Sequence, residues 1–294
     1  VTAVKSRYAK DGVTFDVSYS HQKLSTNTIA MDENNQPFRD NTGVLVLRQA
    51  GHGALIENLS DLKADISFIK NIDNVVPDRL KYETHRYKKT LGGLLVSVQE
   101  ELFAFLKQLS TSPIKESTLT HMIEWRQETF SLAAPKGFAN QTTSERVAFL
   151  HRQFNRPIRV CGMVKKTKEH GGGPFWVQHN DGTQSIQIVE ITQIDTKAAD
   201  QQAILESSTH FNPVDIICGL RDYRGNSFDL RNFVDHDTGI ITIKFHEGRT
   251  LRTLEHPGLW NGSMANWNTI FVEVPSITFN PVKTVLDLLR PEHQ

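Results

Sequence analysis

Cysteine is scarce in this chain, and neither sign of charge is in excess. Cys161 and Cys218 are the only cysteines among 294 residues. Two are too few for a disulfide framework, so we expect a reducing compartment, the cytoplasm. The 33 lysines and arginines are balanced by 33 aspartates and glutamates. This balance excludes a general nucleic-acid-binding surface, which needs concentrated positive charge, but it permits a local site for one nucleotide.

Long apolar runs are also absent, which argues against a membrane partner. The longest candidate, residues 91–106, is interrupted by Gln99, Glu100 and Glu101, whereas a membrane-spanning helix needs roughly 20 apolar residues. The opening VTAVKSRYAKDG lacks the apolar core and cleavage pattern of a signal peptide. Because Val1 is not methionine, we expect a soluble piece of a protein that is processed upstream or continues upstream.

The first eighty residues alternate strand-like and helix-like patterns, as α/β proteins do. We expect a strand at 13–19 and buried strands at 43–48 (GVLVLR) and 66–72 (ISFIKNI). The helical spacing at 54–63 places a helix between the two buried strands. Together these segments predict a βαβ unit with parallel strands.

Residues 80–156 change character, because apolar residues recur at helical spacing. Helices are expected at 82–109, 119–132 and 144–154, with Ser144 capping the last. We interpret this stretch as a structural, helical insertion. From Pro157 onward the pattern returns to strands, with a hairpin at 237–239 and a closing helix at 282–290. The expected strands are 158–164, 185–194, 214–220, 240–245 and 269–274.

Gly51-His52-Gly53 forms the first candidate site, at an expected strand-to-helix junction. Free backbone N–H groups at a helix start attract anions, and glycine allows a ligand to come close. A simple tight turn would have the same sequence. Neither a Walker loop nor a G-x-G-x-x-G dinucleotide motif is present.

Asp73 is the second candidate, in NIDN just after an expected buried strand. Open α/β sheets bind ligands at this edge, and Mg²⁺ is often held by one carboxylate together with substrate phosphate oxygens. The alternative is that Asp73 caps the following turn.

Four further side chains could belong to a ligand site. Glu190 lies in the apolar run IQIVEITQI, so it lines a polar pocket or occupies a sheet edge. Asn212 and Asn268 can hydrogen-bond to sugar hydroxyls or serve as turn residues. Lys283 precedes a helical stretch, where a cation is favourable if an anion binds nearby; solvent exposure is the alternative.

Metal and hydrolase motifs are missing despite 12 histidines. No H-E-x-x-H, C-x-x-C or His/Cys pair at zinc spacing occurs. His236, between Asp235 and Asp237, is interpreted as part of a solvated loop. No G-x-S-x-G elbow indicates a serine hydrolase.

Taken in order, several short motifs resemble the UTP–glucose-1-phosphate uridylyltransferase type of sugar nucleotidyltransferase. AGHGALIENL is similar to that family's PGHGD-type loop, FIKNIDNVV to its N-x-DN strand end, IQIVEITQID to its LEIAQ strand and STHFNPVDII to its FNTNN segment. The stretch from Leu254 to TFNPVKTVLDLL resembles its LE…DN…VP…F-x-PVK…DLL block. SHQKLSTNTIAMD, GHGALIENL and PGLWNGSMANWNTIFVEVP are more similar still to a bacterial domain-of-unknown-function family considered nucleotidyltransferase-like.

The resemblance implies a nucleotide-diphospho-sugar transferase fold, a mixed sheet flanked by helices. Residues 1–294 would be the C-terminal portion of one such domain, with 80–156 inserted and the first strands, in the missing N-terminal part, upstream. A sugar 1-phosphate would attack an NTP and release pyrophosphate. Gly51, His52 and Gly53 would face phosphate or sugar, and Lys283 would neutralise the reacting phosphates. Asp73 would bind Mg²⁺, while Glu190, Asn212 and Asn268 would contact the substrate.

Three departures qualify the resemblance. Ala54 replaces the family's Asp, and FNPVD lacks the second Asn of FNTNN. The family's glycine-rich nucleotide loop, with its catalytic basic residue, has no match, so we expect this chain alone to be inactive. The C-terminal β-helix of some relatives is also missing.

Two other functions remain open. One is a non-catalytic sugar-nucleotide-binding or regulatory module, which would bind the same ligands without releasing pyrophosphate. The other is a scaffold that uses the helical insertion, which predicts an exposed apolar patch on 82–109 and no ligand pocket.

Overall fold

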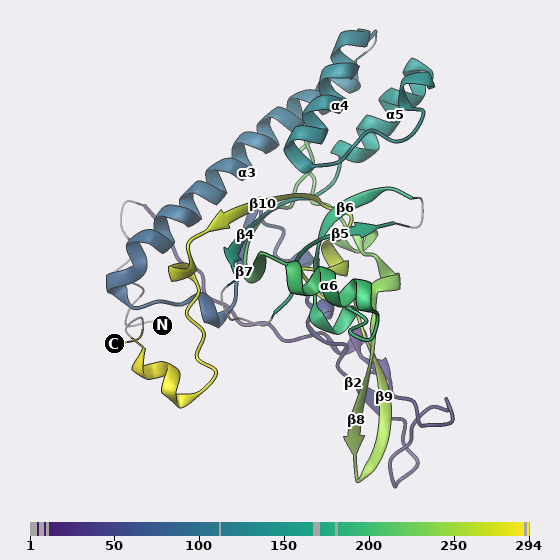
Figure 1. Cartoon of the computed structure of the whole chain (residues 1–294), viewed down its shortest axis with the longest axis vertical. Coiled ribbons are helices and arrows are strands. Elements are labelled where there is room, and N and C mark those ends of the chain that lie inside the picture. The colour runs from purple at the N-terminus through teal and green to yellow at the C-terminus, as the bar shows by residue number, and fades with distance from the viewer. Residues whose placement is uncertain are drawn as a thin grey trace.

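A four-stranded mixed sheet forms the centre of the molecule (Figure 1). The computed structural model describes Lys5, Ala9, residues 12–111, 113–166, 171–179 and 182–290, and His293. In the order β10-β4-β7-β3, β4 and β10 are parallel, and β7 is antiparallel to both β4 and β3. The expected mixed sheet is therefore confirmed. Its strands are β3 (Ile66–Lys70), β4 (Ile158–Lys165), β7 (His210–Gly219) and β10 (Asn268–Val274).

Helix α3 (Lys81–Leu109) covers one face of this sheet, and α4 (Glu116–Phe130) and α5 (Thr143–Phe154) share its core. In Figure 1, α3 runs along the sheet and α4 and α5 stand beyond its end. The expected helices are confirmed, although Thr142 rather than Ser144 caps α5, through a reciprocal capping box with Glu145. Ser131, with a φ of 57°, ends α4 in the left-handed conformation.

The apolar stripe of α3 is buried, because it packs on the sheet. Leu91, Leu95 and Leu102 have no exposed surface and share a core cluster with Val160 and Ile217 of the strands. The scaffold hypothesis predicted an exposed apolar patch here, and this expectation was wrong. No helix of the described ranges is long and apolar enough to span a membrane.

A second core covers the opposite face of the sheet. Cys161 and Cys218 lie in it, both free and fully buried. Burial raises the pKa of Cys161 to about 11, so the thiol stays protonated. Helix α2 (Ile56–Asp61) and the 3₁₀ helix η7 (Leu230–Phe233) contribute residues to this core.

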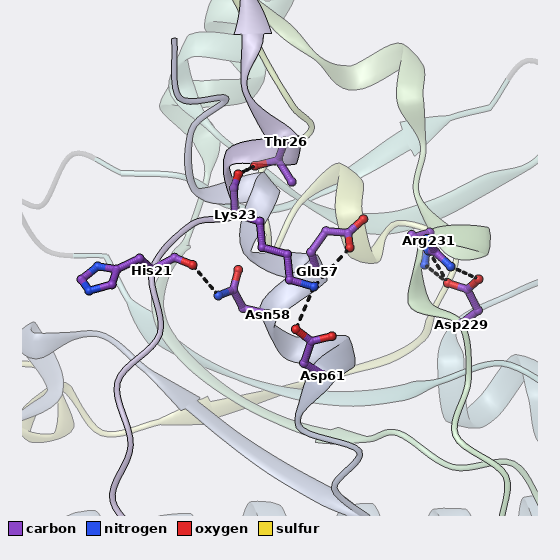
Figure 2. Close-up of polar contacts among 8 residues, drawn as sticks. All are labelled: His21, Lys23, Thr26, Glu57, Asn58, Asp61, Asp229 and Arg231. Carbon is purple, nitrogen blue, oxygen red and sulfur yellow. Dashed lines mark hydrogen bonds and ion pairs between the residues drawn. The ribbon is translucent and has the colours of Figure 1, made fainter. Parts of the chain in front are cut away.

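The segment before β1 is tied to α2 by polar contacts (Figure 2). Lys23 Nζ lies 2.7 Å from Asp61 Oδ2 and 3.6 Å from Glu57 Oε2. Asn58 Nδ2 donates to the carbonyl of His21 at 2.8 Å. These contacts hold the helix that follows Gly53 against the rest of the chain.

Three two-stranded ribbons lie around the sheet, and the β8–β9 ribbon projects away from it (Figure 1). Strands β1, β5 and β9 were not expected from the sequence, nor was helix α6 (Ala199–Ser207). The ribbons are β1 (Thr28–Ile29) with β2 (Leu47–Arg48), β5 (Gly173–Gln178) with β6 (Gln184–Val189), and β8 (Ile240–His246) with β9 (Arg249–Glu255).

The expected βαβ unit does not form. Residues 13–19 contain no strand, and in 43–48 only the last two residues are strand, paired with β1 instead of β3. The apolar run there belongs to a ribbon that is buried on one face only, so Val46 is buried while Val44 and Leu47 are exposed. Strand β3 is an antiparallel edge strand rather than a buried parallel one.

Three boundaries near the C-terminal half also differ from expectation. Residues 236–238 form a 3₁₀ helix, and the hairpin turns instead at Glu247-Gly248, where both φ angles are positive. The strand expected at 185–194 ends at Val189, because Glu190 begins the 3₁₀ helix η6 (Ile191–Gln193). At 282–290 the chain forms a 3₁₀ helix over Val285–Leu289.

The remaining short elements are all 3₁₀ helices. They are η1 (Leu24–Thr26), η2 (His52–Leu55), η3 (Ile72–Asn74), η4 (Asp78–Leu80), η5 (Phe138–Asn140), η9 (Gly262–Met264) and η10 (Ser276–Thr278).

Substitution of Phe154, at the end of α5, tests how much the packing of the helical layer, α3, α4 and α5, contributes to the stability of the fold. It is fully buried and contacts the rings of Phe105 and Trp125. We expect Phe154→Ala to lower the free energy of unfolding by about 3–5 kcal/mol, because it removes an aromatic ring and leaves a cavity. Leu62→Ala, at a 62% exposed position, should change it by less than about 0.5 kcal/mol. Urea unfolding followed by circular dichroism measures both; equal effects would contradict the packing described.

Candidate functional site

The Gly51-His52-Gly53 junction is a tight turn with no room for side chains. Gly51 has a φ of 75°, and a Cβ atom there would lie 2.9 Å from Glu255 Oε2. A Cβ atom at Gly53 would collide with the carbonyl of Pro257. Packing therefore accounts for both glycines, and the chemistry of the junction rests on His52.

His52 lies against Trp260, with the two rings stacked 4.2 Å apart at an angle of 18°. Its Nδ1 accepts a hydrogen bond from the backbone N–H of Leu259 at 3.1 Å. A backbone N–H can only donate, so Nδ1 carries no proton and the neutral ring bears its proton on Nε2. Desolvation lowers the pKa of His52, against the opposing charges of Glu190 and Glu255. At neutral pH the ring is an uncharged donor through Nε2.

Glu190 is hydrogen-bonded to the same tryptophan, Trp260. Trp260 Nε1 donates to Glu190 Oε1 at 2.8 Å, so one indole ring holds the histidine on its face and the carboxylate at its edge. Glu190 also lies beside Gly172, where a Cβ atom would be 2.9 Å from Oε2. The half-buried carboxylate is thus oriented by a neutral donor.

Asn212 is linked to Gly172, the neighbour of Glu190, through its backbone. Its N–H donates to the carbonyl of Gly172 at 2.8 Å, and its side-chain Oδ1 accepts from the N–H of Val214 at 3.0 Å. Val214 has a φ of 58°, so the side chain of Asn212 stabilises an irregular turn within β7. We call Gly51, His52, Gly53, Glu190 and Trp260 the His52 group; Asn212 borders it.

Asp73 and Lys283 meet in a second place, although 210 positions separate them in the chain. Asp73 is buried in η3, directly after β3, and Lys283 Nζ donates to its Oδ2 at 2.6 Å. The Lys283 side chain is 68% exposed while that of Asp73 is 10% exposed. The ammonium group therefore faces solvent while it is held by a buried carboxylate. The two alternatives considered from the sequence were that Asp73 only caps a turn and that Lys283 is only solvated. Neither of them includes the ion pair that the two side chains form.

A buried ion pair lies close to Asp73 and was missed from the sequence. Lys88 of α3 contacts the carboxylate of Asp215 on β7, and Asp215 is 2% exposed. Asp215 pairs in the sheet with Lys70, which is three residues before Asp73. Burial, reinforced by the charge of Lys70, lowers the pKa of Lys88 to about 8. We call Lys70, Lys88, Lys283, Asp73 and Asp215 the lysine cluster.

Asn268 belongs to neither group. It is 3% exposed, and its Nδ2 donates to the carbonyl of Phe154 at 3.3 Å. The side chain thus links the start of β10 to the end of α5.

The sequence carried a signal for some of the missed residues but not for others. Trp260 stands in the family-like stretch PGLWNG, where an aromatic residue between two nearby glycines could have been noticed. Lys88 has no such signal, because one lysine in a long amphipathic helix is usually a solvated residue. Among the described residues, no group of three or more His, Cys, Asp or Glu side chains could hold a metal ion.

The stacking of His52 on Trp260 can be tested through its titration. We expect Trp260→Ala to raise the pKa of His52, because it removes the ring that desolvates the imidazole and frees the carboxylate of Glu190. NMR titration of the histidine ring signals measures this directly. Trp176→Ala removes a 61% exposed tryptophan and should leave the pKa of His52 unchanged. A fall in the pKa of His52 on Trp260→Ala would contradict the assignment.

The Lys88–Asp215 pair predicts strong coupling between the two residues. Lys88→Met should lower the free energy of unfolding by about 3–5 kcal/mol, because it leaves a buried, unpaired carboxylate. Adding Asp215→Asn should recover much of that loss, since the charge disappears. Lys23→Met, which breaks a more exposed pair with Asp61, should have a much smaller effect. Additive effects of the two buried substitutions in urea unfolding would refute the pairing.

Structures of UDP-glucose pyrophosphorylase from Leishmania major are similar to this chain. A variant in complex with UDP-glucose is 14% identical with a TM-score of 0.44, and the match covers 98% of this chain and 51% of that protein. The open and closed structures of the enzyme give 14% identity, a TM-score of 0.43 and the same two coverages. The chain therefore spans about half the length of these proteins.

A search of curated proteins finds none that matches this chain. The protein-family comparison does give a match: the family described as "Domain of unknown function (DUF4301)" matches residues 1–294, the whole chain. The chain therefore belongs to the DUF4301 family.

Proposed function

We propose that this chain is part of a nucleotidyltransferase-like protein of the cytoplasm. The reaction would condense an NTP, UTP in the first place, with a sugar 1-phosphate to give an NDP-sugar and pyrophosphate. The observation that carries the proposal is the Lys283–Asp73 ion pair. Two motifs that resemble separate parts of a nucleotidyltransferase site lie 210 residues apart in sequence, yet their charged side chains meet.

The lysine cluster suits the charges of that reaction. A phosphate oxygen of the sugar 1-phosphate would attack the α-phosphorus of the NTP. The bond from that phosphorus to the bridging oxygen would break, and its electron pair would leave with pyrophosphate. Catalysis of such transfers depends on positioning and on neutralising negative charge. The cluster contains three lysines and two carboxylates, which would leave net positive charge beside the phosphates, and Lys70 and Lys283 are its exposed members.

Magnesium is the proposed cofactor, with Asp73 as its protein ligand. One carboxylate is enough where substrate phosphates and water supply the other oxygens. The fit is partial, because Asp73 Oδ2 already accepts a hydrogen bond from Lys283. When bound, the ion would neutralise phosphate charge. Lys283, whose side chain is 68% exposed, could contact the phosphates from the same place.

The His52 group is proposed to recognise the sugar or its phosphate. His52 can donate from Nε2, and Glu190 can accept from a sugar hydroxyl through the oxygen not engaged by Trp260. Asn212 borders this group through Gly172. Asn268 would support the site from the start of β10 instead of touching substrate.

A non-catalytic sugar-nucleotide-binding module is the second candidate. One observation favours it: the carboxylate of Asp73, the proposed magnesium ligand, is already engaged by Lys283. Such a module would bind the same ligands through Lys283 and the His52 group but would not release pyrophosphate.

Binding is the first test of the proposal. Isothermal titration calorimetry with UTP and with UDP-glucose, in the presence of MgCl₂, should show saturable binding to the natural protein. Lys283→Met should weaken binding by about 10–100-fold, which corresponds to roughly 1.4–2.8 kcal/mol. Lys107→Met, at an exposed position in the last turn of α3, is the matched control and should not change affinity. Absence of binding to any NTP or UDP-sugar would overturn the proposal.

Pyrophosphate release separates the two candidates. The enzyme would release it from UTP and a sugar 1-phosphate, and Asp73→Ala would abolish turnover, a loss of about 3 kcal/mol or more of transition-state stabilisation. The module would bind the same compounds without turnover.

A further inference from the structure

A separate cavity of about 440 Å³ lies where the helical layer meets the β5–β6 hairpin. Residues of α4 and α5, the hairpin and the segment 265–269 line it. No member of the His52 group or of the lysine cluster is among its lining residues. Its volume lies within the range of small-molecule pockets, about 300–1,000 Å³.

Arg126 of α4 contributes a buried positive charge to the wall. Arg126 is 7% exposed, and its guanidinium donates to the carbonyls of Leu132 and Ala133 at 2.9 and 3.0 Å and to Gln153 Oε1 at 3.2 Å. All three acceptors are neutral, and the Nε of Arg126 has no acceptor among the described residues. Burial, with a contribution from Arg156, lowers the pKa of Arg126 to about 10.

Arg156, just after α5, adds a second charge of the same kind. It donates to the carbonyls of Arg152 and Asn266, at 3.2 and 3.5 Å, and these acceptors are again neutral. In the described part of the chain, neither Arg126 nor Arg156 forms an ion pair. Desolvated cations without a counter-ion cost free energy, which a bound anion would offset.

One carboxylate, that of Asp235, also lines the cavity. It accepts a hydrogen bond from the backbone N–H of Asp237 at 3.1 Å. With Arg126 and Arg156 counted, the wall still carries one net positive charge. An anion would therefore find the cavity favourable.

Two neutral groups on the wall also lack partners within the described ranges. Trp267, 4% exposed, has a free Nε1 donor, and Gln187, 9% exposed, has a free Oε1 acceptor. The orientation of the Gln187 amide is fixed, because its Nε2 donates to the carbonyl of Ala265 at 3.1 Å. Buried groups of this kind usually have a partner. Both atoms are themselves covered, so the donors that a ligand in the cavity can reach are those of the guanidinium groups.

We propose that this cavity binds a small organic oxyanion, a phosphate or carboxylate compound. The guanidinium groups of Arg126 and Arg156 hold the oxyanion, and the side chains of Trp267 and Gln187 lie in the same wall. Phe130 and Phe149 supply the apolar part of the wall.

NMR of the indole N–H groups tests the proposal, because the chain has four tryptophans. Inorganic phosphate and citrate are titrated separately at constant ionic strength, with NaCl as the balancing salt. The signal of Trp267, assigned with Trp267→Phe, should shift saturably with at least one of the two probes. Saturation by phosphate alone identifies a phosphate compound, and saturation by citrate alone a carboxylate. No saturable shift of the Trp267 signal with either probe would overturn the proposal.

Matched variants show whether the effect belongs to this cavity. Arg156→Gln should weaken the apparent affinity at least 10-fold, and Gln187→Glu, which adds a negative charge, should abolish binding. Arg231→Gln removes an exposed arginine that pairs with Asp229 outside the cavity and should have no effect (Figure 2). Lys283→Met should also have none, which separates this site from the lysine cluster. An unchanged affinity in both Arg156→Gln and Gln187→Glu, with indole signals still dispersed as in the parent, would refute the assignment.

Discussion

Strand β7 pairs along both of its edges, with β3 on one side and β4 on the other, and its course determines where the charged groups lie. The pairing with β4 shifts register between Gly162 and Val164, opposite the point where Val214 takes a φ of 58°. A bulge of this kind re-aims neighbouring side chains. Asn212 turns its N–H to Gly172, near the His52 group, and Asp215 faces Lys88 under α3. One irregular strand thus serves both groups.

Periodicity predicted the long elements well, because a buried face leaves a repeating pattern. The three helices of 80–156 and the strands β4, β7, β8 and β10 lie close to their expected positions. The pattern could not show which strand pairs with which, so the parallel βαβ unit expected around 43–72 was wrong. Short ribbons such as β1–β2 also escaped prediction. Their two-residue strands leave no periodicity to detect, and their stability comes from contacts such as that between Thr28 and Leu254.

Motif order, rather than periodicity, assigned Asp73 and Lys283 to one candidate site, and their side chains do meet in the structure. It could not predict Lys88 or Trp260, since their partners, Asp215 and Glu190, become neighbours only in the folded chain. The glycines of the His52 junction illustrate the same limit. The sequence left open whether they serve a ligand or a turn, and the close approach of Glu255 and Pro257 shows that packing is a sufficient reason for glycine at both positions.

The sequence led us to interpret the helical layer as purely structural. The structure shows that it also supplies positive charge to the lysine cluster and to the cavity. Lys88 comes from α3 and Arg126 from α4, while Arg156 follows α5 directly. Burial lowers the pKa of each of them, which means that folding works against their charged forms. An apolar residue in place of Arg126 or Arg156 would avoid that cost, whereas at position 88 it would leave the buried carboxylate of Asp215 unpaired. Arg126 and Arg156 donate to neutral acceptors only, which fits the anionic ligand proposed for the cavity, and the helical layer would then serve that ligand as well as the core.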